Sequence, residues 1–423
     1  MDLRARAARI RDASSRTRDH GGTPLRRDSD LGARPRLADP MRLDRPFAVP
    51  FEHRVRFTQA ALDPANDALS SVLADPSADG DSRRLAAFVD AGVLAAHPMI
   101  PESLARYIAA RTRAGEPLPE LACCEPVPGG ESTKDGTGTV DQVMLATERF
   151  RIDRRSVVLA IGGGAVLDAV GFAAATAHRG VRHVRMPTTV LAQDDAAMGV
   201  KNGVNRFGKK NYVGAFCPPD GVVCDRDFLP TLPERHFLGG FSEAVKIACL
   251  RDAALLERIE RDAAALRKRS VDAAWPIIIR SAELHLQHIT DGGDPFERLN
   301  ARPLDFGHWA AHKLEQVTGF ELPHGEAVAI GVALDCTYSM LSGLLAEPEC
   351  DRVVACLRSL GLPVWHPALA DTTRLLRGLD EFREHLGGRL TVTLLRGIGS
   401  PTDVHAMDGP TVARAAERLA NLD

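Results

Sequence analysis

Residues 157–180 read VVLAIGGGAVLDAVGFAAATAHRG, and this stretch decides the fold class of the 423-residue chain. It begins with a continuous apolar run of strand length, which the glycines at 162–164 interrupt before a segment with the apolar content of a buried helix. In such a strand, glycine turn and helix, backbone N–H groups at the helix start can meet a diphosphate. Many turns of this kind use glycine for steric reasons alone, so this motif leaves a nucleotide site and a purely structural turn equally open.

The segments on either side extend the α/β pattern. HRVRF, RRLAAFVDAGV, HVRMP and GVVCD predict short strands, and PESLARYIAARTRA predicts a helix after a proline start. Beyond residue 235 nearly everything has helical spacing, with helices predicted at 242–268, 274–290, 308–317, 326–343, 350–360 and 411–421. We therefore expect an α/β fold in which an N-terminal Rossmann-like nucleotide-binding domain, residues 46–230, precedes an all-helical domain, residues 231–423.

Charge and cysteine content narrow the classes of partner. The chain has 53 Lys plus Arg against 56 Asp plus Glu, so no global field favours nucleic acid or a membrane surface, and any anion site must be local. The eight cysteines follow no disulfide or zinc-finger spacing, which favours free thiols in a reducing cytosol. No apolar run approaches the roughly 20 residues that a bilayer span needs, and the hydrophobic middle of a signal peptide is missing. We expect a soluble, cytoplasmic protein without nucleic-acid or membrane partners.

The first 45 residues are predicted to be a disordered extension. They consist largely of Arg, Asp, Gly and Pro and have little to bury, so they cannot offset the entropy of ordering. Their acidic residues argue against a transit peptide. Met41 stands where ordinary folded sequence begins, which suggests an alternative start that an intact-mass measurement would test.

Acidic residues and histidines in the helical part suggest a metal site. LDFGHWAAHKLE places His308 and His312 four residues apart on one helix face, and His324 follows in LPHGEAVAIG. FSEAVK puts Glu243 and Lys246 on the first turn of another helix. Two or three imidazoles and a carboxylate from separate helices predict a three-ligand site for zinc or a similar ion, with a position open to substrate. Each histidine alone is more simply a hydrogen-bonded helix residue, but the joint pattern favours the metal.

Together with MPTTVLAQDDAAMGVKNGVNRFGKKNYVGAF, these stretches resemble the successive signatures of 3-dehydroquinate synthase and its relatives, the sugar phosphate cyclases. The likeness covers about residues 50–400 in the right order, and within the superfamily the chain is most similar to the dehydroquinate-synthase-like proteins of bacterial ebo clusters. The resemblance implies a carbon–oxygen lyase that uses NAD and zinc or cobalt. Such enzymes oxidise a substrate hydroxyl, eliminate phosphate, reduce the ketone again and close a carbocycle.

The resemblance also implies roles for individual residues. The positions that match NAD contacts are Asp90, Glu131, Lys134, Gly163, Gly164, Asp168, Thr188 and Thr189. The positions that match metal ligands are Glu243, His308 and His324, and those that match catalytic or substrate-bridging residues are Asp195, Lys201, Lys210, Asn211, Lys246 and His312. Arg179 matches an arginine that reaches the substrate of a neighbouring subunit, which implies a homodimer. Asp90 also suits an adenosine ribose on chemical grounds, because a carboxylate at a strand end can accept from both hydroxyls.

The basic stretch KNGVNRFGKKN, residues 201–211, gains a function from this resemblance. An isolated basic stretch is usually a solvated surface turn. A departing phosphate dianion, however, needs fixed ammonium and amide donors in a place from which water is excluded. We therefore interpret these residues as a loop that holds the phosphate.

The stretch ARPLDFGH departs from the family pattern of an arginine followed by LLNFGH. Ala301 takes the place of the arginine that binds the substrate carboxylate, and Asp305 replaces the asparagine, a mismatch of about 3 kcal/mol or more for a desolvated charge. Such an aspartate is similar to that of cyclases acting on sedoheptulose 7-phosphate, although those typically lack the second histidine, His312. Near the C-terminus, Arg383 takes the place of a family lysine. We therefore favour a neutral ketose phosphate over the acidic substrate of a true 3-dehydroquinate synthase.

Two other functions stay open. A metal-dependent polyol or glycerol-type dehydrogenase shares the two-domain layout, but it has no leaving phosphate for the lysine-rich stretch to hold. A non-catalytic binding member of the family would explain the altered carboxylate site, but it would leave the metal and NAD residues without a task.

Overall fold

The computed structural model describes residues 43–74, 83–298, 303–385 and 388–422. The chain divides into two compact units, Met1–Pro50 and Phe51–Asp423. In the first unit, residues 43–50 are exposed and belong to no helix or strand. The remainder of the predicted disordered extension, including Met41, lies outside the described residues. The predicted domain boundary near residue 230 stays a prediction.

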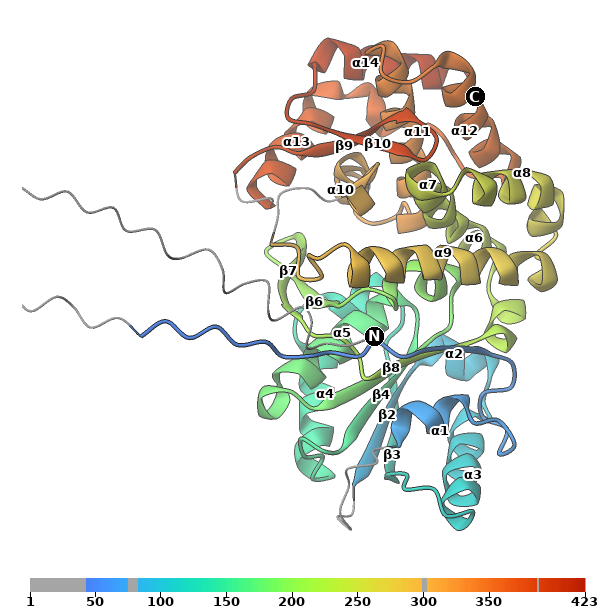
Figure 1. Cartoon of the computed structure of the whole chain (residues 1–423), viewed down its shortest axis with the longest axis vertical. Coiled ribbons are helices and arrows are strands. Elements are labelled where there is room, and N and C mark those ends of the chain that lie inside the picture. The colour runs from blue at the N-terminus through green and yellow to red at the C-terminus, as the bar shows by residue number, and fades with distance from the viewer. Residues whose placement is uncertain (1–42, 75–82, 299–302, 386–387, 423) are drawn as a thin grey trace, which may run out of the picture. The chain divides into compact units, whose positions relative to one another are not determined.

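Six parallel strands form the main sheet of the second unit, in the order β1-β8-β5-β4-β2-β3 (Figure 1). The strands are β1 (Val55–Thr58), β2 (Arg84–Asp90), β3 (Glu120–Val127), β4 (Val157–Gly162), β5 (Arg182–Pro187) and β8 (Gly221–Asp225). Every residue of β4 and β8 is buried, which explains their uninterrupted apolar sequences. The predicted α/β fold is confirmed.

Helices cover both faces of this sheet (Figure 1). Along β2, Phe88 belongs to the core shared with α4 and α5, whereas Leu85 and Val89 belong to the core shared with α1 and α3. Successive side chains of a strand point to opposite faces, so one short apolar strand serves both cores. The covering helices are α4 (Gly138–Arg149) and α5 (Gly164–Thr176) on one face, and α1 (Ala68–Leu73) and α3 (Ile100–Arg113) on the other.

The sheet has a topological switch point between β2 and β4. The chain places β3 on one side of β2, and then adds β4, β5 and β8 in turn on the other side. Open parallel sheets bind ligands beyond the carboxyl ends of the strands at such a point. Asp90 ends β2 and Gly162 ends β4, and a Cβ on Gly162 would lie 3.2 Å from the Cβ of Asp90. The residues predicted to bind a nucleotide therefore flank the switch point.

Residues 201–211 are not the predicted loop but the larger part of a β-hairpin. β6 (Lys201–Arg206) pairs antiparallel with β7 (Lys209–Phe216). Asn, Gly and Lys are poor strand formers, so the sequence resembled a turn. Close packing overrides this preference, because a Cβ on Gly203 would lie 2.9 Å from the carbonyl oxygen of Val213 on the partner strand.

The C-terminal part is mainly helical, but it is not all-helical as predicted. A two-stranded hairpin, β9 (Val392–Gly397) and β10 (Ser400–Val404), packs against the helices. The predicted helix 242–268 is two helices, because the Asp252 side chain caps a new helix by accepting from the N–H groups of Ala254 and Leu255. The helices are α6 (Glu234–Gly239), α7 (Phe241–Arg251), α8 (Ala253–Arg267), α9 (Val271–Asp291), α10 (His308–Val317), α11 (His324–Leu341), α12 (Glu347–Ser359), α13 (Thr372–His385) and α14 (Gly409–Ala420). In the described part of the chain, none is both long and apolar enough to cross a membrane.

Two glycines let α11 approach its neighbours at backbone distance. A Cβ on Gly325 would lie 2.2 Å from the carbonyl oxygen of Gly239, and one on Gly331 would lie 2.0 Å from that of Gly307. Any side chain at these positions would separate the segments. The close approach brings the start of α11 beside the end of α6, and the middle of α11 beside the start of α10.

Candidate active site

Three helix starts bring the predicted metal ligands together. Glu243 lies in the first turn of α7, and His308 and His324 are the first residues of α10 and α11. One ligand atom from each lies within 4.8 Å of the others. Glu243 Oε1 is 3.4 Å from His308 Nε2 and 3.5 Å from His324 Nε2. A carboxylate oxygen facing two imidazole nitrogens fits the ligand set of a divalent ion such as zinc.

Burial of Glu243 strengthens this fit. Its side chain is 1% exposed, and neither carboxylate oxygen makes a well-formed hydrogen bond, although Lys246 Nζ lies 2.5 Å from Oε2. Burial raises the pKa of Glu243, but the charges of Lys246 and His308 outweigh burial and hold the pKa well below its usual value. The carboxylate is therefore ionised and available to an ion.

Lys246 connects the metal cluster with the edge of the sheet. Its Nζ is 3.7 Å from Asp195 Oδ1, in the π-helical turn η4 (Ala192–Ala196) that follows β5. His285 Nδ1, on α9, lies 2.9 Å from the same oxygen. Burial lowers the pKa of Lys246, but the carboxylates of Glu243 and Asp195, and the weaker effect of Asp305, raise it above its usual value. A charged ammonium group therefore stands among three acids.

His312 lies next to the cluster in a neutral state. Its ring centroid is 5.4 Å from that of His308 and 5.9 Å from that of His324. Burial, together with the charge of His308, lowers the pKa of His312 to about 3. With so low a pKa the imidazole stays neutral near neutral pH, so it can form hydrogen bonds without carrying a charge.

At the switch point, glycines allow close packing against Asp90 and Thr189. A Cβ on Gly129 would lie 2.4 Å from the Asp90 carboxylate, and a Cβ on Gly163 would lie 3.4 Å from Thr189 Cγ2. Asp90 Oδ1 accepts from the N–H of Gly92 at 2.7 Å. Gly163 precedes α5 without any side-chain cap, so the first N–H groups of that helix have no partner from a capping side chain. Such an N-terminus suits a diphosphate.

The predicted cofactor residues Glu131, Lys134 and Asp168 meet the hairpin. The Nζ of Lys134, whose side chain is 4% exposed, donates to Asp168 Oδ2 at 2.7 Å and also to the side chain of Asn211. Glu131 Oε1 is 3.5 Å from the Nζ of Lys210. The adjacent hairpin residues Lys210 and Asn211 thus contact residues predicted to bind the cofactor. Thr188, another predicted cofactor residue, is buried directly after β5.

Four predicted residues lie in exposed positions, and one of them is Asn211, which bonds Lys134. Lys201 is 54% exposed and pairs with Glu297, and Arg383 pairs with Asp380 at 3.1 Å on α13. Arg179 is exposed beside the turn that precedes β5. No ion pair among the described residues joins Lys201, Arg179 or Arg383 to the metal cluster, and Ala301 lies outside the described residues.

Sequence reasoning missed several partners of the site, namely Asn205, His285, Glu297 and Glu315. Glu315 had a usable signal, because it follows His308 by seven residues and His312 by three, on the same face of the helix. His285 and Glu297 had none, because their partners Asp195 and Lys201 lie about 90 residues or more away along the chain, and the bond of Asn205 to Glu131 is also remote.

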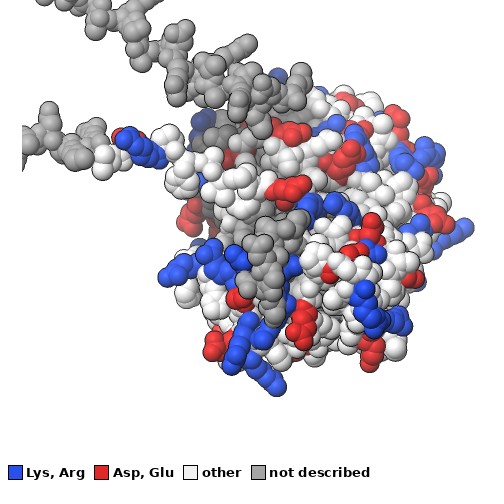
Figure 2. Space-filling model, turned by 60° about the horizontal axis from the view of Figure 1, so that its bottom comes forward, with Lys and Arg blue, Asp and Glu red and all other residues white. Residues whose placement is uncertain are grey.

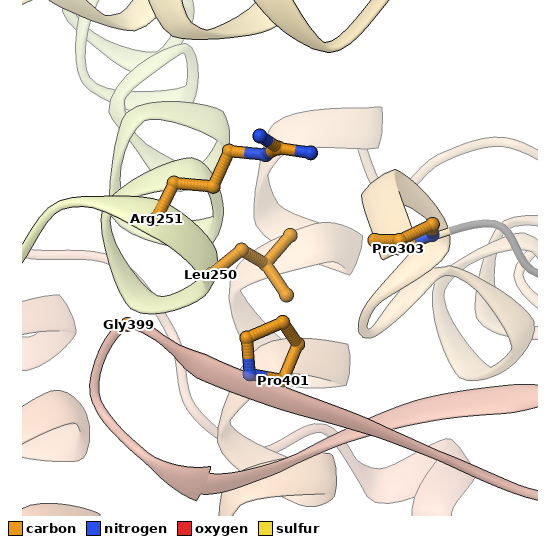
Figure 3. Close-up of a pocket in the computed structure, with 5 residues that line it drawn as sticks. All are labelled: Leu250, Arg251, Pro303, Gly399 and Pro401. Atoms are coloured by element: carbon orange, nitrogen blue, oxygen red, sulfur yellow. The ribbon is translucent and has the colours of Figure 1, made fainter. Parts of the chain in front are cut away.

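A cavity of about 350 Å³ lies at the end of α7 opposite to Glu243, and the metal ligands do not line it. Figure 3 shows its lining, which comes from the end of α7, from Pro303 near Asp305, and from the turn between β9 and β10. On the outer surface, basic and acidic side chains are interspersed over the face shown in Figure 2. That face therefore presents no field of a single sign.

Comparisons with known proteins agree with the resemblance that the sequence motifs indicate. The family descriptions 3-dehydroquinate synthase N-terminal and 3-dehydroquinate synthase C-terminal match residues 125–239 and 240–381. The 2-epi-5-epi-valiolone synthase of Streptomyces glaucescens is 34% identical over 84% of this chain and 88% of its own length. The 3-dehydroquinate synthase of Halorhodospira halophila is 36% identical over 74% of this chain and 88% of its own.

A solved structure shows the likeness in three dimensions. The 2-epi-5-epi-valiolone synthase ValA from Streptomyces hygroscopicus, with NAD+ and Zn2+ bound, has a TM-score of 0.79 and 32% identity. The match covers 90% of this chain and 100% of that one. The finer resemblance to the ebo-cluster proteins stays a prediction. In sequence, order of motifs and fold, the chain belongs to the superfamily of sugar phosphate cyclases that includes 3-dehydroquinate synthase.

Proposed function

We propose that this protein is an NAD- and divalent-metal-dependent cyclase that eliminates phosphate from a ketose phosphate and closes a carbocycle. The observation that carries the proposal is the convergence of Glu243, His308 and His324 beside Lys246, which Asp195 connects to the carboxyl edge of the sheet. The solved relative with NAD+ and Zn2+ supports the same pair of cofactors here.

Glu243, His308 and His324 would hold zinc or cobalt, and the switch point around Asp90 and Gly163 would hold NAD. When bound, these groups supply a Lewis acid and a reversible hydride acceptor. The chain supplies the remaining functions. Lys246 presents a charged ammonium group to a substrate oxygen, and the neutral imidazole of His312 can hydrogen-bond a substrate hydroxyl.

The charge of Asp305 favours a substrate without a carboxylate. Asp305 acts on the ammonium group of Lys246, which Glu243 and Asp195 also approach, at 2.5 and 3.7 Å from Nζ. Glu243 and Asp195 follow the family pattern, whereas Asp305 departs from it and would repel a substrate carboxylate, which would also find no guanidinium where Ala301 replaces the arginine. We therefore propose a ketose phosphate without a carboxylate, such as sedoheptulose 7-phosphate.

The test is phosphate release measured side by side on sedoheptulose 7-phosphate and on the acidic shikimate-pathway precursor, with NAD and either zinc or cobalt. We expect release from the neutral sugar and at least 100-fold less activity in Glu243→Gln, which removes the charged ligand. Faster release from the acidic precursor would identify a true 3-dehydroquinate synthase. Net NADH formation on polyols would identify a dehydrogenase, and no turnover of any seven-carbon sugar phosphate would point to a binding protein.

We also propose that the enzyme is a cytoplasmic homodimer. Arg179 is exposed, as an arginine that reaches a neighbouring subunit must be. Light scattering coupled to size-exclusion chromatography checks the oligomeric state, and a monomer under assay conditions would contradict it.

A further inference from the structure

Glu315 is a buried acid on α10 for which the proposed reaction gives no role. Its side chain is 3% exposed, and each of its two oxygens faces a different basic group. Oε1 accepts from Lys210 Nζ at 2.8 Å, and Oε2 lies 3.2 Å from His324 Nδ1. Neither His324 Nδ1 nor Glu315 Oε2 has a well-formed hydrogen bond in the described part of the chain, so the two atoms face each other without a competing partner.

The two nitrogens of His324 therefore face two different carboxylates. Nε2 lies 3.5 Å from Glu243 Oε1, inside the cluster, whereas Nδ1 faces Glu315. A histidine that binds a metal must be neutral, with its hydrogen on the nitrogen that does not bind the ion. His308 meets this need through Phe306, whose backbone carbonyl lies 3.1 Å from His308 Nδ1. Among the described residues His324 Nδ1 has no carbonyl partner, and the carboxylate that faces it and can take its hydrogen is that of Glu315.

We propose that Glu315 is a positioning residue that fixes the tautomer and ring orientation of His324 for metal binding. The inference rests on the proposed metal site. Carboxylates beside metal-binding histidines orient the ring and raise its basicity. Glu315 does not itself bind the ion.

A different reading of the same residues would make Glu315 a ligand, because His312, Glu315 and His324 also have ligand atoms within 4.8 Å of one another. Lys210 argues against that reading. Its Nζ, with a side chain 11% exposed, bonds Oε1, and the positive charge so close to the oxygens disfavours a cation there. One ion per chain is therefore expected.

Glu315 also ties the metal cluster to the β6–β7 hairpin. Lys210 lies 3.5 Å from Glu131 Oε1, which accepts from Asn205 Nδ2 at 3.0 Å. Asn205 Oδ1 in turn accepts from the N–H of Asn211 at 3.0 Å. The network is continuous from the metal cluster through β7 to the residues predicted to bind NAD, so loss of Glu315 should disturb both sides.

The experiment measures zinc affinity by chelator competition, metal content by elemental analysis, and the absorption spectrum of the cobalt form. The variants are Glu315→Ala and Glu315→Gln, with Glu381→Gln as the control. Glu381 lies on α13 and pairs with Lys313 Nζ of α10 at 2.5 Å, away from His324. We expect Glu315→Ala to weaken zinc binding by about 10- to 100-fold and to change the cobalt spectrum.

The variants Glu315→Gln and Glu381→Gln should affect zinc binding less than Glu315→Ala does. Glu315→Gln keeps an oxygen that can accept from Nδ1, so its loss should be smaller, and Glu381→Gln should stay within about 2-fold of wild type. Unchanged zinc affinity and cobalt spectrum in Glu315→Ala would overturn the positioning role alone. If Glu315→Ala does not fold, an unchanged affinity and spectrum in Glu315→Gln would do the same. Two bound ions in the wild type and one in Glu315→Ala would show that Glu315 is itself a metal ligand, which would also overturn the positioning role. A wild type that binds neither zinc nor cobalt would overturn the proposed metal site itself.

Discussion

Lys201 and Lys209 form a matched pair for testing the phosphate-holding function of the hairpin. Lys201 begins β6 and Lys209 begins β7, and their side chains are 54% and 55% exposed. Each pairs with one glutamate, Lys201 with Glu297 and Lys209 with Glu384 at 3.8 Å. Exposed ion pairs contribute roughly 0–1 kcal/mol, so replacing either lysine by alanine should change the free energy of unfolding by less than about 1 kcal/mol.

Turnover should separate the two variants. If Lys201 stabilises the departing phosphate, Lys201→Ala removes a charged donor from the transition state, and because the side chain is 54% exposed we expect a loss of about 10-fold in rate, or about 1.4 kcal/mol. Lys209→Ala removes a charge of equal exposure that matches no substrate position, so its rate should stay within about 3-fold of wild type, a change below about 1 kcal/mol.

The assay is the initial rate of phosphate release for both variants at the same metal and NAD concentrations, with urea unfolding to verify equal stability. Equal rate losses in the two variants, or a wild-type rate in Lys201→Ala, would refute the reasoning. A large difference in stability would also refute it, because the rate could then reflect folding.

Three further predictions follow from buried contacts. Burial raises the pKa of Asp335 from 3.8 to about 7, so its contribution to the free energy of unfolding is full below about pH 4 and is lost progressively up to about pH 7, by at most about 4 kcal/mol. Urea unfolding should show this fall in the wild type and not in Asp335→Asn, and parallel pH curves would contradict it. Gly331→Ala should cost about 1–3 kcal/mol in thermal unfolding, because its Cβ would lie 2.0 Å from a backbone oxygen, whereas Gly138→Ala has open space and should be nearly neutral. Asp90→Asn should weaken NAD binding at least about 10-fold in calorimetry, because a charged acceptor of the ribose hydroxyls is lost, and an unchanged Kd would count against the switch-point site.

Local sequence patterns predicted many of the helices and strands correctly. The apolar run at 157–161 and the glycines after it predicted β4 and the start of α5, because periodicity and glycine conformation act over a few neighbouring residues. The same locality explains the errors. Asp252 interrupts a helical pattern through a capping bond, and β9 and β10 pair with each other where no strand was predicted.

The metal ligands could be identified from the sequence, but their position in space could not. Residue types and family motifs nominated Glu243, His308 and His324, although no spacing rule places three separate helix starts together. Gly331 and Gly325 allow that convergence, because α11 passes its neighbours at backbone contact distance. The sequence contained these glycines but not the segments they would meet.

By itself, the amino-acid sequence determined the α/β class, the order of the motifs and the chemical types of the site residues, since these depend on local periodicity and composition. Only the tertiary structure decided the partners. It paired Lys210 with Glu315 across 105 residues, Lys201 with Glu297, and Asp195 with His285. The physical reason is that such pairs form where helices and strands pack in space, and packing joins residues that no local pattern relates.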